Sequence, residues 1–219
     1  MALGYGLIAA ALVAAALDWH AVWRGNREPE YVLKPLTMVV LIAAAVVLGS
    51  DDPAFVLGFT MAALVLSLAG DVFLMLPRDM FVAGLGSFLL AHMAYITAFS
   101  SFSPSLQVPV IVSVAVIAGF MYARLFRGML ARRTQALAAP VALYVLAISA
   151  MVVFALGAAG SADWSTGRKA FAIFGAFLFF ASDGMIGWSR FVEDFPRSRV
   201  LIMVTYHLAQ AGLVLGLLG

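Results

Sequence analysis

Residues 54–76 read AFVLGFTMAALVLSLAGDVFLML, and this stretch decides the class of fold. It matches the length of about 17 to 25 apolar residues that a helix needs to cross the hydrocarbon core of a bilayer. Its one charged residue, Asp71, lies inside the segment, where a charge costs about 2.5 to 3.5 kcal/mol even on the lenient insertion scale. The stretch therefore predicts a membrane helix whose buried carboxyl group has a function.

Seven further apolar stretches of similar length lie on either side of it. The eight spans are expected near residues 3–22, 33–49, 54–76, 80–99, 108–126, 138–159, 169–190 and 199–218. Short loops containing charged residues, proline or glycine separate them, and no linker or low-complexity tail is left over. The sequence predicts an all-α integral membrane protein, a bundle of about eight transmembrane helices in one domain over residues 1–219.

The composition excludes a soluble protein. Hydrophobic residues make up 64% of the chain and charged residues 11%, against roughly 25% charged residues in soluble domains. The net charge of +2 comes from arginines in short loops, so the expected partner is the lipid bilayer and not nucleic acid. The chain has no cysteine, which excludes disulfides, thiolate metal sites and a thiol nucleophile. The oligomeric state is left open.

The distribution of Lys and Arg predicts the topology. Only Arg168 and Lys169 fall at the ends of even-numbered loops. The other eleven lie in or beside the odd-numbered loops: Arg24, Arg27, Lys34, Arg78, Arg124, Arg127, Arg132, Arg133, Arg190, Arg197 and Arg199. Because basic loops stay in the cytoplasm, both termini are expected on the non-cytoplasmic side. The first basic residue is Arg24, so the first span is expected to be retained as a helix. An Arg-rich, Lys-poor chain suggests a bacterial inner membrane.

Two aspartates and several other polar residues are predicted to gather in the cytoplasmic half of the bundle. At 1.5 Å per residue, Asp71 and Asp183 both lie roughly 8 to 11 Å from the cytoplasmic ends of their spans. Lys34 and Tyr144 are placed on the same half, and Ser67 and Ser182 lie beside the two aspartates. His92 is expected near mid-membrane with Tyr95 one turn beyond it, and Tyr206 and Gln210 at intermediate depth. Interhelical hydrogen bonds account for some of these as well as function does. Asn or Ser would serve that purpose at less cost than two aspartates.

A weak internal repeat is also visible. Each half of the chain places an Asp in its third span and a His in its fourth: Asp71 and His92, then Asp183 and His207. The pattern suggests a parallel repeat of four plus four helices.

Paired carboxyl groups in a site of low dielectric suit acid and base catalysis. Two such groups close together should not both ionise, so one is expected to hold a proton. Glycoside cleavage uses the same division of roles around an oxocarbenium-like transition state. Lys34, Arg78 and Arg190 are expected at the interface, where they would meet a lipid phosphate. Lys34 and Pro35 are expected to begin a helix, whose N-terminus favours anions.

Three other interpretations compete with catalysis by carboxyl groups. His92, His207, Asp71 and Asp183 form a candidate zinc site, although no H-x3-H spacing occurs. A proton-coupled transporter of a lipid or other small molecule would use the aspartates as a relay, but transporters often show inverted repeats. A purely structural scaffold leaves the paired aspartates without an explanation.

Several motifs, spread in order over nearly the whole chain, resemble those of the YhhN family of multi-pass membrane proteins. The matching positions are Lys34–Thr37, Ser67–Leu76, Gly84–Tyr95, Tyr144, Ser182-Asp183, Tyr206 and Gln210. The resemblance implies hydrolysis of the vinyl ether bond of a lysoplasmalogen, an alkenyl glycerophosphoethanolamine or glycerophosphocholine, to a fatty aldehyde and the glycerophospho head group.

This activity agrees with the chemistry expected of the aspartates, because acid cleaves a vinyl ether through an oxocarbenium ion. Asp71 and Asp183 would be acid and base, in an order that the sequence does not assign, and His92 would take part in catalysis. The remaining polar positions would bind or orient the lysophospholipid: Lys34, Ser67, Tyr95, Tyr144, Ser182, Tyr206 and Gln210. No cofactor is required.

Overall fold

Eight long α-helices make up most of the chain in the computed structural model, which describes residues 1–219. They are α1 (Ala2–Trp23), α2 (Arg27–Leu48), α3 (Ala54–Met75), α4 (Phe81–Ser100), α5 (Val108–Ala131), α6 (Ala138–Ala158), α7 (Thr166–Phe191) and α8 (Ser198–Leu218). Short 3-10 helices at Gly49–Asp51 and Gln135–Leu137 lie between them. All eight α-helices are long and apolar enough to cross a membrane, so the predicted helical class and helix count are confirmed.

The largest departures from the hydropathy pattern are in α2 and α5, where polar turns at one end remain helical. The Asn26 side chain caps α2 by accepting a hydrogen bond from the backbone N–H of Glu28, and the helix begins at Arg27 instead of residue 33. α5 continues to Ala131 instead of residue 126. The expectation that Lys34 begins a helix is therefore wrong: Lys34 lies two turns inside α2 and is buried.

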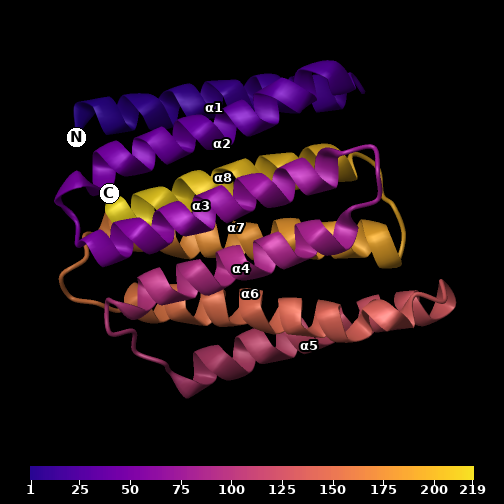
Figure 1. The fold of residues 1–219 in the computed structure, drawn as a ribbon. Coiled ribbons are helices and arrows are strands. Elements are labelled where there is room, and N and C mark those ends of the chain that lie inside the picture. The colour runs from indigo at the N-terminus through magenta and orange to yellow at the C-terminus, as the bar shows by residue number, and fades with distance from the viewer.

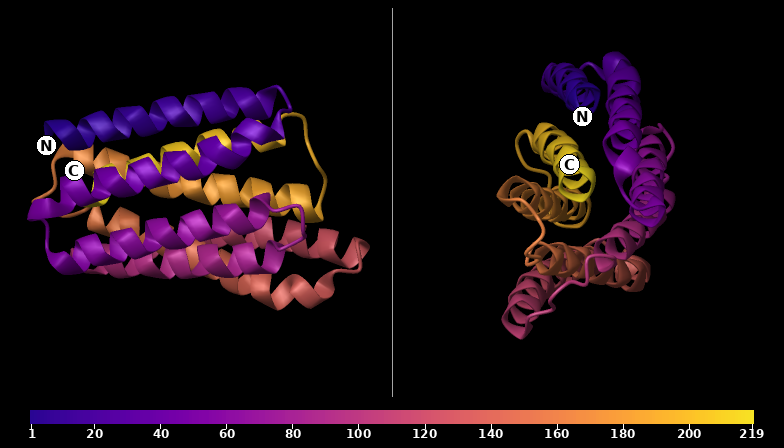
Figure 2. Two further views of the ribbon diagram at one scale, coloured as in Figure 1. Left: turned by 45° about the horizontal axis from the view of Figure 1, so that its top comes forward. Right: turned by 90° about the vertical axis from the view of Figure 1, so that its left-hand side faces the viewer.

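Seven of the helices form a closed ring, and α5 lies outside it. The neighbours around the ring are α1, α2, α3, α4, α6, α7 and α8, and α8 returns to α1. Figure 2 shows this arrangement end-on in its right-hand view. α8 also touches α2 and α3, while α5 packs on α6 and α7 from outside. Since α5 is displaced, α4 packs directly on α6, two helices further along the chain.

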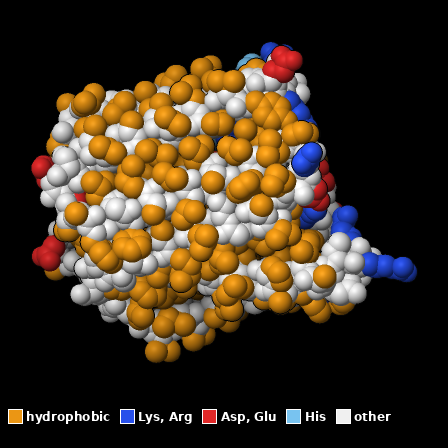
Figure 3. Space-filling view, viewed as in Figure 1, with side chains coloured by type: hydrophobic (Ala, Val, Ile, Leu, Met, Phe, Trp, Pro, Cys, Tyr) orange, Lys and Arg blue, Asp and Glu red, His pale blue; other side chains and the backbone are white.

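Apolar side chains cover the flank of the bundle, and charged side chains gather at its ends. Successive helices run in opposite directions, so both termini lie at one end (Figure 1). On the face shown in Figure 3, Lys and Arg are concentrated at the opposite end. This distribution is that of a multi-pass membrane protein. The side of the membrane that each end faces and the four-plus-four repeat stay predictions.

Candidate active site

Each helix of the ring contributes a buried polar side chain, whereas α5 contributes none. In chain order from α1 to α8, with α5 omitted, these include Asp18, Lys34, Asp71, His92, Tyr144, Asp183 and Tyr206. The hydrogen-bonded members form two separate groups, one around each of the two predicted aspartates.

Asp71 is held by partners from two other helices. Lys34 Nζ of α2 lies 2.9 Å from its Oδ1, and the Tyr206 hydroxyl of α8 donates a 2.6 Å hydrogen bond to its Oδ2. The side chains of Lys34 and Asp71 are 5% and 1% exposed. A buried ammonium and a buried carboxylate compensate each other's lost hydration when the contact is this close. Both oxygens of Asp71 are therefore engaged, and Lys34 is ion-paired within the bundle.

Asp183 is held through only one of its oxygens. The Tyr144 hydroxyl donates to Oδ2, and His92 Nε2 lies 3.1 Å from the same atom and 3.0 Å from the Tyr144 hydroxyl oxygen. Because the phenolic hydrogen points to Asp183, we place a hydrogen on Nε2 so that His92 also donates to Oδ2. The Oδ1 atom makes no hydrogen bond with the protein.

The two aspartates, which the sequence placed at the same depth, belong to separate groups of polar side chains. No hydrogen bond joins them, because each is engaged by different neighbouring helices. Phe179 packs against both groups, with its ring centroid 4.8 Å from that of His92 and 5.6 Å from that of Tyr206. The predicted acid and base are therefore two distinct centres.

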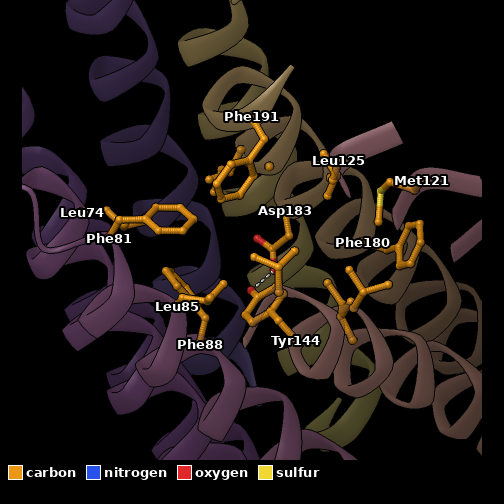
Figure 4. A pocket seen from close by; sticks show the side chains of 16 residues that line it. Leu74, Phe81, Leu85, Phe88, Met121, Leu125, Tyr144, Phe180, Asp183 and Phe191 are labelled. Atoms are coloured by element: carbon orange, nitrogen blue, oxygen red, sulfur yellow. Dashed lines mark hydrogen bonds between the residues drawn. The ribbon is translucent and has the colours of Figure 1, made fainter. Parts of the chain in front are cut away.

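The carboxyl groups open onto two adjoining cavities. An apolar pocket, drawn in Figure 4, lies between α3, α4, α5, α6 and α7, and Asp183 and Tyr144 meet at its wall. A polar cavity of about 470 Å³ is lined by Asp71, Lys34 and Tyr206. The residues common to the two linings are Leu74, Phe81, Phe88 and Ile186. An apolar and a polar compartment therefore share a boundary made of these four apolar side chains.

The other predicted site residues divide between the cavities and the packed interior. Ser182 lines the polar cavity, and its hydroxyl donates to the carbonyl oxygen of Ile202 at 3.2 Å. The Tyr95 hydroxyl donates to Gln210 Oε1 at 2.6 Å, and both residues are fully buried. Ser67 is also buried, and its hydroxyl has no partner. Tyr95, Gln210 and Ser67 line neither cavity.

The candidate zinc ligands do not come together. No three His, Asp or Glu side chains are grouped so that they could hold a metal ion. His207 Nδ1 instead accepts a 3.0 Å hydrogen bond from Trp19 Nε1. The four residues are divided because Asp71 pairs with Lys34, whereas His92 is next to Asp183.

Asp18 lies near the end of α1, but its side chain is fully buried. Both of its carboxylate oxygens lack a hydrogen-bond partner. The sequence held one sign of this burial, because Asp18 lies five residues before the end of α1, more than one helical turn inside it. Arg27 and Arg199, which line the polar cavity, were counted only as topology signals, because loop arginines follow the positive-inside pattern whether or not they bind a ligand.

The loop between α3 and α4 is attached to α7 beside the wall between the cavities. Arg190 Nη2 lies 2.5 Å from Asp79 Oδ2, and its guanidinium stacks over the Phe81 ring at 5.0 Å. The hydrogen bond from Arg190 lowers the pKa of the exposed Asp79 carboxyl below its usual range. Arg78, which was expected to meet a phosphate, does not line either cavity.

The fold and the site define a polytopic membrane protein with two polar centres buried inside a helical bundle. Comparison with known proteins is more specific: the chain belongs to the YhhN family, whose sequence profile matches residues 30–217. The resemblance that the motifs indicated is confirmed. No solved structure matches the chain.

Curated relatives carry a functional name. The chain is similar to human lysoplasmalogenase TMEM86B, 37% identical over 148 residues that cover 68% of this chain and 58% of the relative. It is 31% identical to mouse lysoplasmalogenase TMEM86B over 214 residues, 95% of this chain and 85% of the relative. A lysoplasmalogenase of Mycobacterium tuberculosis is 33% identical over 184 residues, 80% of this chain and 65% of the relative. The matched region thus spans less than two thirds of the human and mycobacterial proteins.

Proposed function

We propose that this protein is a lysoplasmalogenase, which hydrolyses the vinyl ether bond of a lysoplasmalogen to a fatty aldehyde and a glycerophospho head group. The similarity to lysoplasmalogenases from mammals and a bacterium supports this class of reaction. The observation that carries the proposal is the pair of adjoining cavities, each with an aspartate at its wall.

The two cavities match the two parts of a lysolipid. A lysoplasmalogen has one hydrocarbon chain, a polar head group and the vinyl ether between them. The polar cavity of about 470 Å³ suits the head group. The apolar pocket has the chemical character that the chain requires, but its volume is about 40 Å³, so its side chains must move apart to admit the chain. In this placement the vinyl ether lies at the common wall, at Leu74, Phe81, Phe88 and Ile186. The scissile bond is then flanked by Asp183 on the chain side and Asp71 on the head-group side.

The partners of each aspartate lead us to assign the roles that the sequence left open. Asp183 is the proton donor, because Tyr144 and His92 hold its Oδ2 and leave Oδ1 free at the apolar pocket. Asp71 is the carboxylate, because Lys34 neutralises it in a buried ion pair. Two carboxyl groups in different surroundings divide acid and base chemistry in this way in other enzymes.

The reaction needs only these two groups and water. Asp183 transfers its proton to the carbon beta to the ether oxygen, and the former double-bond electrons form the new C–H bond. The resulting oxocarbenium ion is stabilised by the Asp71 carboxylate, which takes a proton from the water that adds to the cationic carbon. The hemiacetal then collapses to an aldehyde and the glycerol hydroxyl, and proton exchange with water restores both carboxyl groups.

Aldehyde release from purified protein tests the proposal. With an alkenyl lysophospholipid as substrate, Asp183→Asn should lower kcat by about 10²- to 10⁴-fold, because it removes a general acid. Asp71→Asn should also lower kcat, whereas Asp163→Asn, in the exposed loop after α6, should have no effect. The corresponding saturated alkyl ether should not react, because it has no double bond to protonate.

Two outcomes would contradict this assignment. Full activity in both Asp71→Asn and Asp183→Asn would exclude the aspartates as acid and base. A folded wild-type protein that releases no aldehyde from any alkenyl lysolipid would favour the alternative function, a proton-coupled transporter.

A further inference from the structure

The polar cavity collects cationic side chains from three helices at the arginine-rich end of the bundle. Arg27 and Lys34 come from α2, Arg190 from α7 and Arg199 from α8. The acidic residues in the same lining are Glu30, Asp71 and Asp194. The lining residues themselves sum to one net positive charge, and Arg190 has its carboxylate partner, Asp79, just outside the lining.

Most of these charges already have partners. Lys34 is paired with Asp71, Arg199 Nη2 lies 2.6 Å from Glu30 Oε2, and Arg190 is directed to Asp79. Arg27 makes no ion pair, side-chain hydrogen bond or cation–π contact with the protein, and it is exposed at the cavity. Arg27 is thus the guanidinium with both hydrogen-bonding edges available for a ligand.

The positive-inside pattern alone does not explain why these side chains converge. Arg132, at the same end of the bundle, donates to the backbone carbonyls of Phe191 and Val192. Arg133 is exposed and lines none of the described cavities. Arg27, by contrast, faces a concave space of about 470 Å³, which lies in the range of small-molecule sites. A guanidinium presents paired N–H donors that match the oxygens of a phosphate group.

We propose that the polar cavity is a binding site for the glycerophosphate part of a lysophospholipid, with Arg27 as the main phosphate ligand. This inference rests on the proposed function and makes it more specific. With the phosphate at Arg27, the alkenyl chain is directed across the wall at Phe81 and Phe88 into the apolar pocket. The same placement requires the substrate to approach with its head group at the arginine-rich end of the protein.

Two substrates with the same alkenyl chain test the site: a 1-alkenyl glycerophosphoethanolamine and a 1-alkenylglycerol without phosphate. Arg27→Gln should raise the KM for the phospholipid about tenfold, since it removes a charge-assisted hydrogen bond. Its kcat should be unchanged, because Arg27 is remote from the bond that breaks. For the alkenylglycerol, wild type and Arg27→Gln should have the same KM. Arg133→Gln is the matched control and should behave as wild type with both substrates.

A binding measurement separates this inference from the proposed function. Glycerophosphoethanolamine alone should raise the unfolding temperature of the wild-type protein and of Arg133→Gln, but not that of Arg27→Gln. If the wild type cleaves both substrates and Arg27→Gln changes neither the KM for the phospholipid nor this stabilisation, the phosphate site is wrong and the lysoplasmalogenase activity stands. If the wild type cleaves neither substrate but glycerophosphoethanolamine stabilises it through Arg27, the phosphate site stands and the activity is wrong.

Discussion

Lys34 and Asp71 connect α2 to α3 through charges that would be costly to bury singly. Their 2.9 Å contact lies about two turns inside the bundle, next to a hydroxyl donor from α8. Lys34 was expected at the interface, where it would meet a lipid phosphate, but it is buried and is paired with Asp71 of the protein. The pair therefore positions the Asp71 carboxylate as well as neutralising it.

Replacing Lys34 should show how much free energy it costs to bury the Asp71 carboxylate without a cationic partner. Lys34→Met should lower the free energy of unfolding by about 3 kcal/mol, toward the low end for a broken buried pair, because Tyr206 still donates a hydrogen bond to Asp71 Oδ2. The double variant Lys34→Met/Asp71→Asn should regain most of this loss, since no uncompensated charge is left. Denaturant unfolding in detergent measures both values.

The activity of the double variant supplies the control. It should remain as low as that of Asp71→Asn, because the regained stability does not restore the missing carboxylate. An unchanged unfolding free energy in Lys34→Met would show that the ion pair does not stabilise the bundle.

At the scale of helices, α7 and α8 pack most closely where small residues face each other. Gly212 and Gly216 of α8 lie against Ala172 and Gly175 of α7. A Cβ atom on Gly216 would be only 2.6 Å from the Ala172 Cα. Membrane helices use such small residues to bring their backbones close together. This contact holds α7, which carries Asp183, against α8, which carries Tyr206.

Gly216→Ala should therefore destabilise the protein even though alanine favours helices. The added methyl must push α8 away from α7, because the obstructing atoms include main chain. Gly119→Ala in α5 is a matched control: its Cβ meets nothing within 4 Å, so it should be neutral or stabilise by up to about 1 kcal/mol. Thermal unfolding in detergent compares the two, and equal effects would contradict close packing at Gly216.

At the scale of the whole molecule, the charge asymmetry predicts which end faces the cytoplasm. The chain has no cysteine, so single cysteines report accessibility without background labelling. Ser101→Cys, after α4, should react with a membrane-impermeant maleimide in intact cells, because that end carries few basic residues. Gln135→Cys, after α5, should react only once the membrane is permeabilised. The reverse pattern would show that the topology is inverted.

The helical architecture was predictable because hydropathy and charge act along single segments. The stretch around Asp71 was recognisable as a membrane helix, and the alternation of basic loops supported the count of eight. Boundaries were less accurate where polar turns continue a helix, as at Arg27. The polar residues of the site were also identifiable, because an aspartate such as Asp183 is costly to bury in a membrane helix and is therefore retained only where it has a role.

The sequence by itself determined the class of protein, the number of helices and the set of buried polar residues. Only the tertiary structure decided which of these residues meet. α5 lies outside the ring, so α4 packs on α6 and brings His92 to Tyr144 and Asp183. The rotation of each helix about its axis turns Lys34 toward Asp71 and Tyr95 toward Gln210. Neighbour order and rotation arise from packing between distant segments, which local hydropathy does not encode.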